Sequence, residues 1–272
     1  MAIDAWVNVN MGELGTPEYL LEAGRRLFKG GEEFFRDWSL EETLEMMDRS
    51  QVERALLAID ARRPSAHVLS FVARRPDRFA LSAELDPRRG RQALLELGKL
   101  MAGEPVVLAR IVPFYSGIPP SDALYYPVYA RCEELGLPLG INTGIPGPPA
   151  PGDCQHPLHL DRVCIRFPEL RLVMTHGADP WWEVAIRLMG KYRHLHLMTS
   201  AYLPRYLPES LLHFMDTRGR DKVIFASDHP AISTPRCLEE ARRLPLRPEA
   251  LEAYLHANAA RLFFSGSPAR AS

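Results

Sequence analysis

The sequence has few cysteines, no long hydrophobic run and no basic leader, and each absence excludes a class of protein. The cysteines, Cys132, Cys154, Cys164 and Cys237, form no CxxC pair, which predicts reduced thiols and a cytoplasmic protein. The first residues, MAIDAWVNVN, carry an early Asp4 and no basic stretch, unlike a secretory signal. No run approaches the roughly 18 apolar residues of a membrane span, so we expect no membrane partner.

The chain also lacks an excess of charge of either sign. It has 33 basic and 34 acidic side chains in 272 residues, for a formal net charge of -1. Nucleic-acid binding needs a clustered basic excess, so we expect no nucleic-acid partner. A small acidic molecule stays compatible with this balance, because one or two well-placed cations are enough to bind it. Hydrophobic residues make up 46% of the chain, which is typical of a globular protein and excludes disorder.

Short apolar runs alternate with longer amphipathic segments along the chain. The predicted strands are Ile3–Val9, Arg54–Ile59, Phe79–Leu85, Val106–Val112, Leu139–Thr143, Leu170–Thr175, His194–Ser200 and Lys222–Ser227. The predicted helices are Leu40–Arg49, Ala66–Arg74, Gly90–Met101, Asp122–Leu135, Leu158–Arg166, Trp181–Tyr192, Glu209–Arg218, Arg236–Arg243 and Glu249–Leu262. Eight strand-then-helix units predict a single-domain (β/α)8 TIM barrel over residues 1–264. A doubly wound sheet is the alternative, but it usually has about five or six strands.

Two segments fall outside this alternation. Residues 11–38 are predicted to form an insertion near the barrel mouth. Residues 265–272 are small and polar, which is typical of a flexible tail.

Polar residues stand where the predicted strands end, and in such a barrel the function lies at these ends. They are Asn8, Glu84, Arg110, Asn142, His176, Ser200 and Asp228. Because side chains alternate along a strand, Asp4, Trp6 and Asn8 are predicted to share one face. We expect Asn8, Asn142, His176 and Asp228 to converge on one cavity. The structural alternative is that each serves the local backbone, as Asp228 would by capping its loop.

The same residues indicate acid/base chemistry on an anionic molecule. His176 and Asp228 would form a general acid/base pair in which the carboxylate orients the imidazole. Arg110 would bind a carboxylate or enolate, or else pair with Glu84. The substrate-contacting set is predicted to be Arg110, Asn142, Asn8, Trp6 and Tyr202, with the last two as an aromatic wall.

Several stretches resemble the amidohydrolase superfamily: IDAWVNVN, LRLVMTHGADPWWEVAIRL, HLHLMTSAYLPRY, KVIFASDHP and HANAARLFF. The resemblance is greatest to the branch that contains aminocarboxymuconate-semialdehyde decarboxylase and resorcylate decarboxylase. It runs in order from Ile3 to Phe264, and its most specific pieces contain His176, Asp228 and Asn258. It implies a barrel that hydrolyses or decarboxylates a small carboxylated cyclic or acyl substrate.

The resemblance also implies a divalent metal, held by H-x-H on the first strand, a histidine on the fifth and an aspartate on the eighth. Here Trp6, Asn8 and Asn142 replace the histidines, while Asp228 and the sixth-strand His176 remain. Asparagine is a weak neutral donor and tryptophan donates nothing to a metal. We therefore predict no metal at the usual site.

A remodelled site for zinc, iron or manganese is the alternative left open. It would use His176 and Asp228, and its further candidate ligands are Asp4, Asp179, His156 and His159. His229 is expected to turn away from the barrel axis unless its strand has already ended.

The sequence thus predicts a divergent amidohydrolase-family enzyme, a hydrolase or decarboxylase that uses His176 and Asp228. The alternative is a catalytically silent relative that binds a small molecule or a partner protein. A homodimer is compatible with either interpretation.

Overall fold

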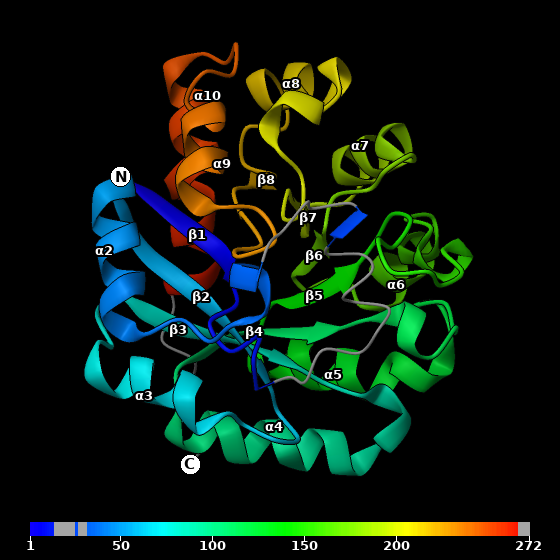
Figure 1. Cartoon of the computed structure of the whole chain (residues 1–272). Helices are drawn as coiled ribbons and strands as arrows, with labels where there is room; N and C mark the ends of the chain where they lie inside the picture. The colour runs from blue at the N-terminus through cyan, green and yellow to red at the C-terminus, as the bar shows by residue number, and fades with distance from the viewer. Residues whose placement is uncertain (14–24, 27–31, 266–272) are drawn as a thin grey trace.

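Eight parallel strands follow one another in chain order around the centre of the molecule, with helices outside them (Figure 1). The computed structural model describes residues 1–13, 25–26 and 32–265. The strands are β1 Ala2–Val7, β2 Val52–Asp60, β3 Phe79–Glu84, β4 Val106–Ile111, β5 Leu139–Asn142, β6 Leu172–Thr175, β7 Leu195–Met198 and β8 Val223–Ile224. This order confirms the predicted (β/α)8 TIM barrel, and the doubly wound alternative is wrong.

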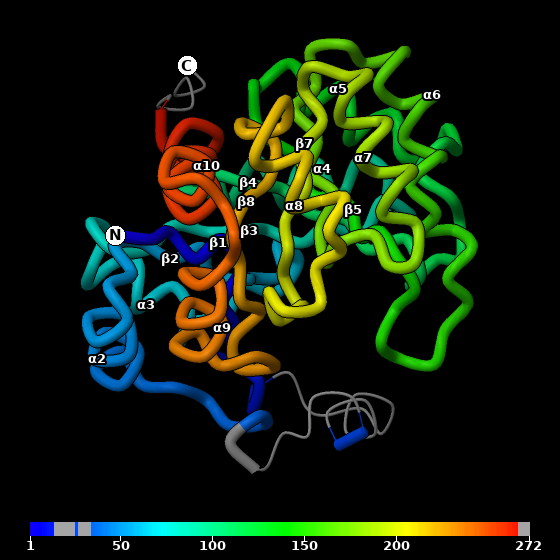
Figure 2. The backbone as a smooth tube through the Cα atoms, turned by 90° about the horizontal axis from the view of Figure 1, so that it is seen from above, coloured from blue at the N-terminus to red at the C-terminus, as the bar shows by residue number. Residues whose placement is uncertain are grey.

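Helices follow the strands as predicted. They are α2 Leu40–Ser50, α3 Ala66–Arg74, α4 Arg91–Gly103, α5 Tyr126–Leu135, α6 His159–Arg166, α7 Trp182–Lys191, α8 Glu209–Asp216, α9 Thr234–Ala241 and α10 Pro248–Glu252. Helix α9 packs beside α2, so helices from the two ends of the chain are neighbours (Figures 1 and 2). The predicted last helix differs, because α10 is followed by π-helical segments at Ala253–Ala257 and Ala260–Phe264.

The barrel closes between β1 and the chain that follows β8. The Ala5 amide donates to the Phe225 carbonyl (3.2 Å) and the Asn8 amide to the His229 carbonyl (2.8 Å). Between them, the Asp228 amide donates to the Trp6 carbonyl at 3.1 Å. The last strand is shorter than predicted, but its continuation still carries Asp228 to the same edge as the end of β1.

A bulge in β1 decides which of its side chains enter the barrel. Asp4 pairs with Ala55 and Val7 with Leu57, so Ala5 and Trp6 both stand opposite Leu56. Ala5, Trp6 and Leu56 belong to the same inner cluster of buried side chains. A bulge places two residues against one and changes the alternation. The prediction that Asp4 shares a face with Trp6 and Asn8 is therefore wrong.

Asp4 instead joins β1 to the chain after β8 and to α9. It is fully buried and accepts hydrogen bonds from the Ser227 amide (2.9 Å), the Ser227 hydroxyl (2.6 Å) and the Thr234 hydroxyl (2.9 Å). Burial raises the pKa of this carboxyl, although its hydrogen bonds act in the opposite direction. Its contacts make Asp4 a structural tie between the two ends of the barrel.

The predicted insertion at residues 11–38 is described only in part. An isolated antiparallel bridge pairs Asn10 with Asp37, and the Trp38 amide donates to the Val9 carbonyl at 2.8 Å. The segment from Asp37 to Trp38 therefore continues beside the end of β1. Residues 14–24 and 27–31, and the tail from 266 to 272, lie outside the described residues. Within the described part, none of the helices has the length and apolar character to cross a bilayer.

Candidate active site

Three side chains, carried by β1, β4 and the residue after β6, are in contact in the barrel mouth. The guanidinium carbon of Arg110, near the end of β4, lies 4.0 Å from the centroid of the Trp6 ring on β1. The imidazole of His176, which directly follows β6, lies 4.3 Å from the same indole. Trp6 and Arg110 are each only 5% exposed. The structure thus brings together three of the predicted site residues.

Within the described residues, the guanidinium of Arg110 has few acceptors for its five N–H donors. Its contact with a carboxylate is an ion pair from Nη2 to Glu84 Oε2 at 3.5 Å, and its buried Nε has no hydrogen-bond partner among the described residues. Burial lowers the pKa of the guanidinium, and Glu84 partly offsets this effect. Burial in turn raises the pKa of Glu84. Arg110 therefore both pairs loosely with Glu84 and keeps donors available.

Asp228 bonds to Asn8 in the same mouth. Asn8 Nδ2 donates to Asp228 Oδ1 at 3.2 Å and to the His229 carbonyl at 3.0 Å. Burial raises the pKa of Asp228 to about 8, against the lowering effects of Asn8 and Arg110. The group is thus mostly a neutral carboxylic acid at pH 7.

His176 does not make the direct bond to Asp228 that the acid/base pair assumed. Its Nδ1 is buried without a partner among the described residues, and its ring rests on Trp6. Burial, with a further contribution from Arg110, lowers the pKa of His176 to about 3. The imidazole is therefore neutral over the usual working range of pH. Burial thus favours the neutral form of both side chains, the carboxylic acid of Asp228 and the imidazole of His176.

The backbone is strained at residues that come after the ends of β6, β7 and β8. His176 has φ 60°, Asp228 φ 65° and Ala201 φ 67°, values that residues other than glycine adopt at a cost of about 1–3 kcal/mol. The His176 conformation is fixed by its amide, which donates to the Ser200 hydroxyl at 3.0 Å. Such strain is concentrated where side-chain direction matters for function.

Gly177 lets two aromatic rings approach the backbone beside His176. It has φ +69°, and a Cβ there would lie 2.5 Å from Trp182 and 2.9 Å from Tyr202. The rings of Trp182 and Tyr202 are themselves edge to face at 5.2 Å. Tyr202, predicted as part of the aromatic wall, thus packs beside the His176 loop. Burial raises its pKa to about 12.

Asn142 is buried, and its amide oxygen is already used. Asn142 Oδ1 accepts a hydrogen bond from the Thr175 hydroxyl at 2.8 Å. The next residue, Thr143, donates from its hydroxyl to the Gly177 carbonyl at 2.5 Å. These bonds fasten the end of β5 to the end of β6.

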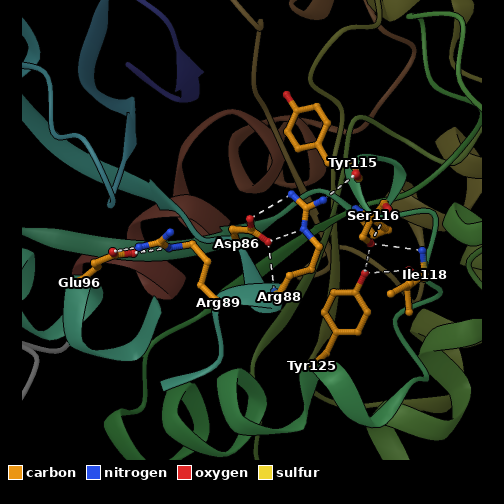
Figure 3. A network of polar contacts seen from close by, with 9 residues as sticks. Asp86, Arg88, Arg89, Glu96, Tyr115, Ser116, Ile118 and Tyr125 are labelled. Carbon is orange, nitrogen blue, oxygen red and sulfur yellow. Dashed lines mark hydrogen bonds and ion pairs between the residues drawn. The ribbon is translucent and has the colours of Figure 1, made fainter. Parts of the chain in front are cut away.

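The loops after β3 and β4 are held together by the network in Figure 3. Arg88 binds both carboxylate oxygens of Asp86 (2.8 and 3.0 Å) and donates to the Tyr115 carbonyl at 3.3 Å. The Tyr125 hydroxyl lies 2.9 Å from the Ser116 hydroxyl and donates to the Ile118 carbonyl at 2.7 Å. The network fixes one wall of the mouth beside Glu84 and Arg110.

The other candidate ligands do not gather around His176 and Asp228. Asp179 Oδ1 accepts from the Trp182 indole at 3.0 Å, and His156 packs on Trp181 at 4.5 Å. His159 Nε2 lies 3.1 Å from the Asp153 carbonyl.

His229 comes after the end of β8, and its ring packs on Trp38 at 4.5 Å. Both of its ring nitrogens are buried without a hydrogen-bond partner in the part of the chain that the structure describes.

The mouth does not fit the divalent metal that the family implies. Trp6 stands where the resemblance implies a histidine and packs on Arg110, Asn8 turns its amide nitrogen to Asp228, and Asn142 has its oxygen bonded to Thr175. Within the described residues there is no cluster of three or more His, Cys, Asp or Glu side chains able to hold a metal ion. Of the donors that the resemblance implies, the described residues keep the His176 imidazole and the Asp228 carboxyl group.

Sequence reasoning missed the residues that support the site. Ser200 stood out only as a polar strand end, and Thr175 and Gly177 only as neighbours of His176 in the THG piece of the resemblance. The His-Gly pair at 176–177 carried a usable signal, because glycine commonly occupies positions that need positive φ.

Two surface cavities lie outside this mouth. One, of about 490 Å³, is lined by Trp38, and the other, of about 210 Å³, by His194.

Comparisons with solved structures find the same fold. An uncharacterized TIM-barrel protein from Bordetella bronchiseptica matches with a TM-score of 0.80 and 24% identity, over 96% of this chain and 97% of that one. The 5-carboxyvanillate decarboxylase of Sphingomonas paucimobilis matches with a TM-score of 0.71 and 18% identity, over 96% and 98%. That of Novosphingobium aromaticivorans, in complex with manganese, matches with a TM-score of 0.72 and 15% identity, over 97% and 96%.

A comparison with curated protein sequences finds no match. The family described as Amidohydrolase matches residues 22–264, which is most of the chain. The chain therefore belongs to the amidohydrolase family.

Proposed function

We propose that this chain is a decarboxylase of a small carboxylated molecule, which binds at Arg110 and receives a proton from Asp228. The observation that carries the proposal is the state of Arg110: a buried guanidinium whose Nε has no partner among the described residues and whose ion pair to Glu84 spans 3.5 Å. A buried charge with unpaired donors costs stability, and it is retained where a ligand completes its bonding. Guanidinium groups match carboxylates because the two carboxylate oxygens can accept two parallel hydrogen bonds.

The protonation states in the mouth support the proton transfer. Since the pKa of Asp228 is about 8, it carries a proton at pH 7 that it can deliver to carbon. The bond from that carbon to the departing carboxylate breaks, its electron pair forms the new C–H bond, and CO2 leaves. Asp228 becomes a carboxylate and regains its proton from water. His176, which stays neutral, positions the ligand through its free Nδ1.

The comparisons support the choice of reaction. Two of the similar structures are 5-carboxyvanillate decarboxylases, at 18% and 15% identity. Hydrolysis of a carboxylated ester, lactone or amide is the other reaction that the family suggests, and product analysis separates the two. A cytoplasmic location and a homodimer stay predictions.

The proposal is tested with a panel of aromatic and aliphatic mono- and dicarboxylates, by measuring released CO2 and identifying products by mass spectrometry. We expect at least one to lose CO2, and Arg110→Ala to weaken its apparent binding by roughly 10- to 100-fold, as for a lost charge-assisted bond. Arg187→Ala, at an exposed position on α7, is the matched control and should change nothing. Turnover that is unaffected by Arg110→Ala would contradict the assigned role.

A second function is favoured by the missing contact between His176 and Asp228. A silent relative would bind carboxylates at Arg110 without converting them. It is distinguished by calorimetric binding that depends on Arg110 while no product forms with any compound of the panel.

A further inference from the structure

We propose that the positive charge that binds the anion in this mouth is the Arg110 guanidinium, held on Trp6, and that no divalent metal takes part in this binding. The anionic ligand follows from the proposed function, whereas the source of the charge follows from the packing of the side chains.

The Trp6 indole is in contact with both Arg110 and His176. The guanidinium carbon of Arg110 lies 4.0 Å from its centroid, and the tilted His176 ring lies 4.3 Å from it between centroids. The indole is almost completely buried. A cation over an indole face gains about 0.5–2 kcal/mol, with the larger values in desolvated sites. The indole thus holds Arg110 in place and fills the space that a ligating imidazole would need.

The two asparagines at the other ligand positions are already bonded to the protein. Asn8 directs its amide nitrogen to Asp228 and to the His229 carbonyl, so a hydrogen-bond donor faces the carboxyl group. The Asn142 oxygen receives the Thr175 hydroxyl. A metal would compete with these bonds and gain only weak neutral oxygen donors in return.

The charge of Arg110 acts on the donors that remain. It lowers the pKa of both His176 and Asp228, so its field reaches the two groups that could still bind a metal. A divalent cation between them would be repelled by a guanidinium that cannot lose its proton. The same field attracts a carboxylate. One fixed cation therefore both excludes the metal and binds the anion.

The test measures metal content and anion affinity, so it does not depend on turnover. Protein purified without chelator, then incubated with Mn²⁺ or Zn²⁺ and desalted, is analysed by mass spectrometry for bound metal. Benzoate affinity is measured by calorimetry in the presence of EDTA and in the presence of Mn²⁺. We expect well under one equivalent of metal and the same benzoate affinity in both buffers. Arg110→Met should lower that affinity by at least roughly tenfold in both.

Trp6→His/Asn8→His/Asn142→His, combined with Arg110→Met, is the reciprocal variant. It restores imidazole donors and removes the competing cation, so it should retain about one equivalent of zinc and melt at a higher temperature when zinc is present. Failure of this folded variant to gain zinc would contradict the stated cause. One equivalent of chelator-resistant metal in the unmodified protein, or benzoate binding that requires Mn²⁺, would overturn the proposal. Absence of benzoate binding in both buffers would overturn its anion-binding half. If decarboxylation is absent while these results hold, only the proposed function fails.

Discussion

Trp6 and Arg110 are in contact across the mouth of the barrel, with the guanidinium carbon 4.0 Å from the centroid of the indole. Their strands, β1 and β4, are separated by two others in the sheet. Two side chains so placed can meet only inside the barrel, so the contact fixes both as inward-pointing. It also joins the His176 side of the mouth to the Glu84 side.

Replacing the indole tests what this contact contributes. Trp6→Phe keeps an aromatic face for Arg110, whereas Trp6→Ala removes it and leaves a cavity. We expect Trp6→Ala to weaken carboxylate binding by roughly 3- to 30-fold, corresponding to a buried cation–π contact, and Trp6→Phe to weaken it less. Calorimetry with benzoate measures both, and equal losses in the two variants would show that the aromatic face is not what holds Arg110.

Arg110→Met/Glu84→Met separates function from stability. The double variant keeps most of the buried volume and removes both charges of the ion pair, and replacing both partners by apolar side chains is often neutral or stabilising by about 1–4 kcal/mol. We therefore expect a melting temperature equal to or above that of the parent protein, together with lost anion binding. Clear destabilisation would mean that the pair with Glu84 at 3.5 Å is a structural bond.

Asp228 gives the folded protein a specific pH dependence. Its pKa is about 8 in the folded state, against an ordinary value of 3.8 for an aspartate side chain. Between these values the folded state holds a proton that the unfolded chain releases, so stability falls as pH rises, by at most about 1.4 kcal/mol per pH unit. Asp228→Asn does not titrate. Urea unfolding at pH 5 and pH 8 should therefore show the parent protein losing more stability than the variant.

His176 should influence turnover without setting the acidic limit of activity. Its pKa near 3 keeps the imidazole neutral between pH 5 and 8. His176→Ala is expected to reduce turnover by roughly 10²-fold, because the ligand loses the Nδ1 that positions it. The remaining rate should follow the same pH profile, with its alkaline limb set by Asp228. Unchanged turnover in a variant shown to be folded by circular dichroism would assign the residue to structure alone.

Gly177→Ala should be strongly destabilising. The new Cβ would lie 2.5 Å from Trp182 at a residue whose φ is +69°, so steric overlap adds to backbone strain and we expect a loss of about 2–4 kcal/mol. Gly98→Ala is the matched control, because this glycine lies within α4 and a Cβ there meets nothing within 4 Å. The control should gain up to about 1 kcal/mol. Thermal unfolding compares the two.

The barrel could be predicted from the sequence because its signals are local and repeated. The capping box of α2 is an example: Ser39 accepts from the Glu42 amide at 3.1 Å, and Glu42 accepts from the Ser39 amide at 2.9 Å. The alternation of short apolar runs with amphipathic segments is likewise contained within each strand–helix unit. The inward direction of Arg110 followed from the same reasoning, since Leu108 lies in the inner cluster.

The details of the site depend on contacts between distant segments, which alternation does not contain. The bulge at Ala5 and Trp6 appears only when β1 is paired with β2, so the face of Asp4 was predicted wrongly. The contacts of His176 and Asp228 depend on distant segments in the same way. Trp6 on β1 supports the His176 ring and Asn8, directly after β1, bonds Asp228, each from about two hundred positions away.

The hydrogen bonds that close the barrel join β1 to the chain after β8, so the barrel can close only late in synthesis. Asn8 and Asp228 are 220 positions apart, so while the first seven units emerge from the ribosome, β1 has one edge without a partner. Exposed strand edges of this kind favour pairing with other chains. The mouth is completed only when residues 225–229 reach Ala5, Trp6 and Asn8. A nascent chain stopped before Phe225 would therefore hold most of the barrel and be prone to aggregate.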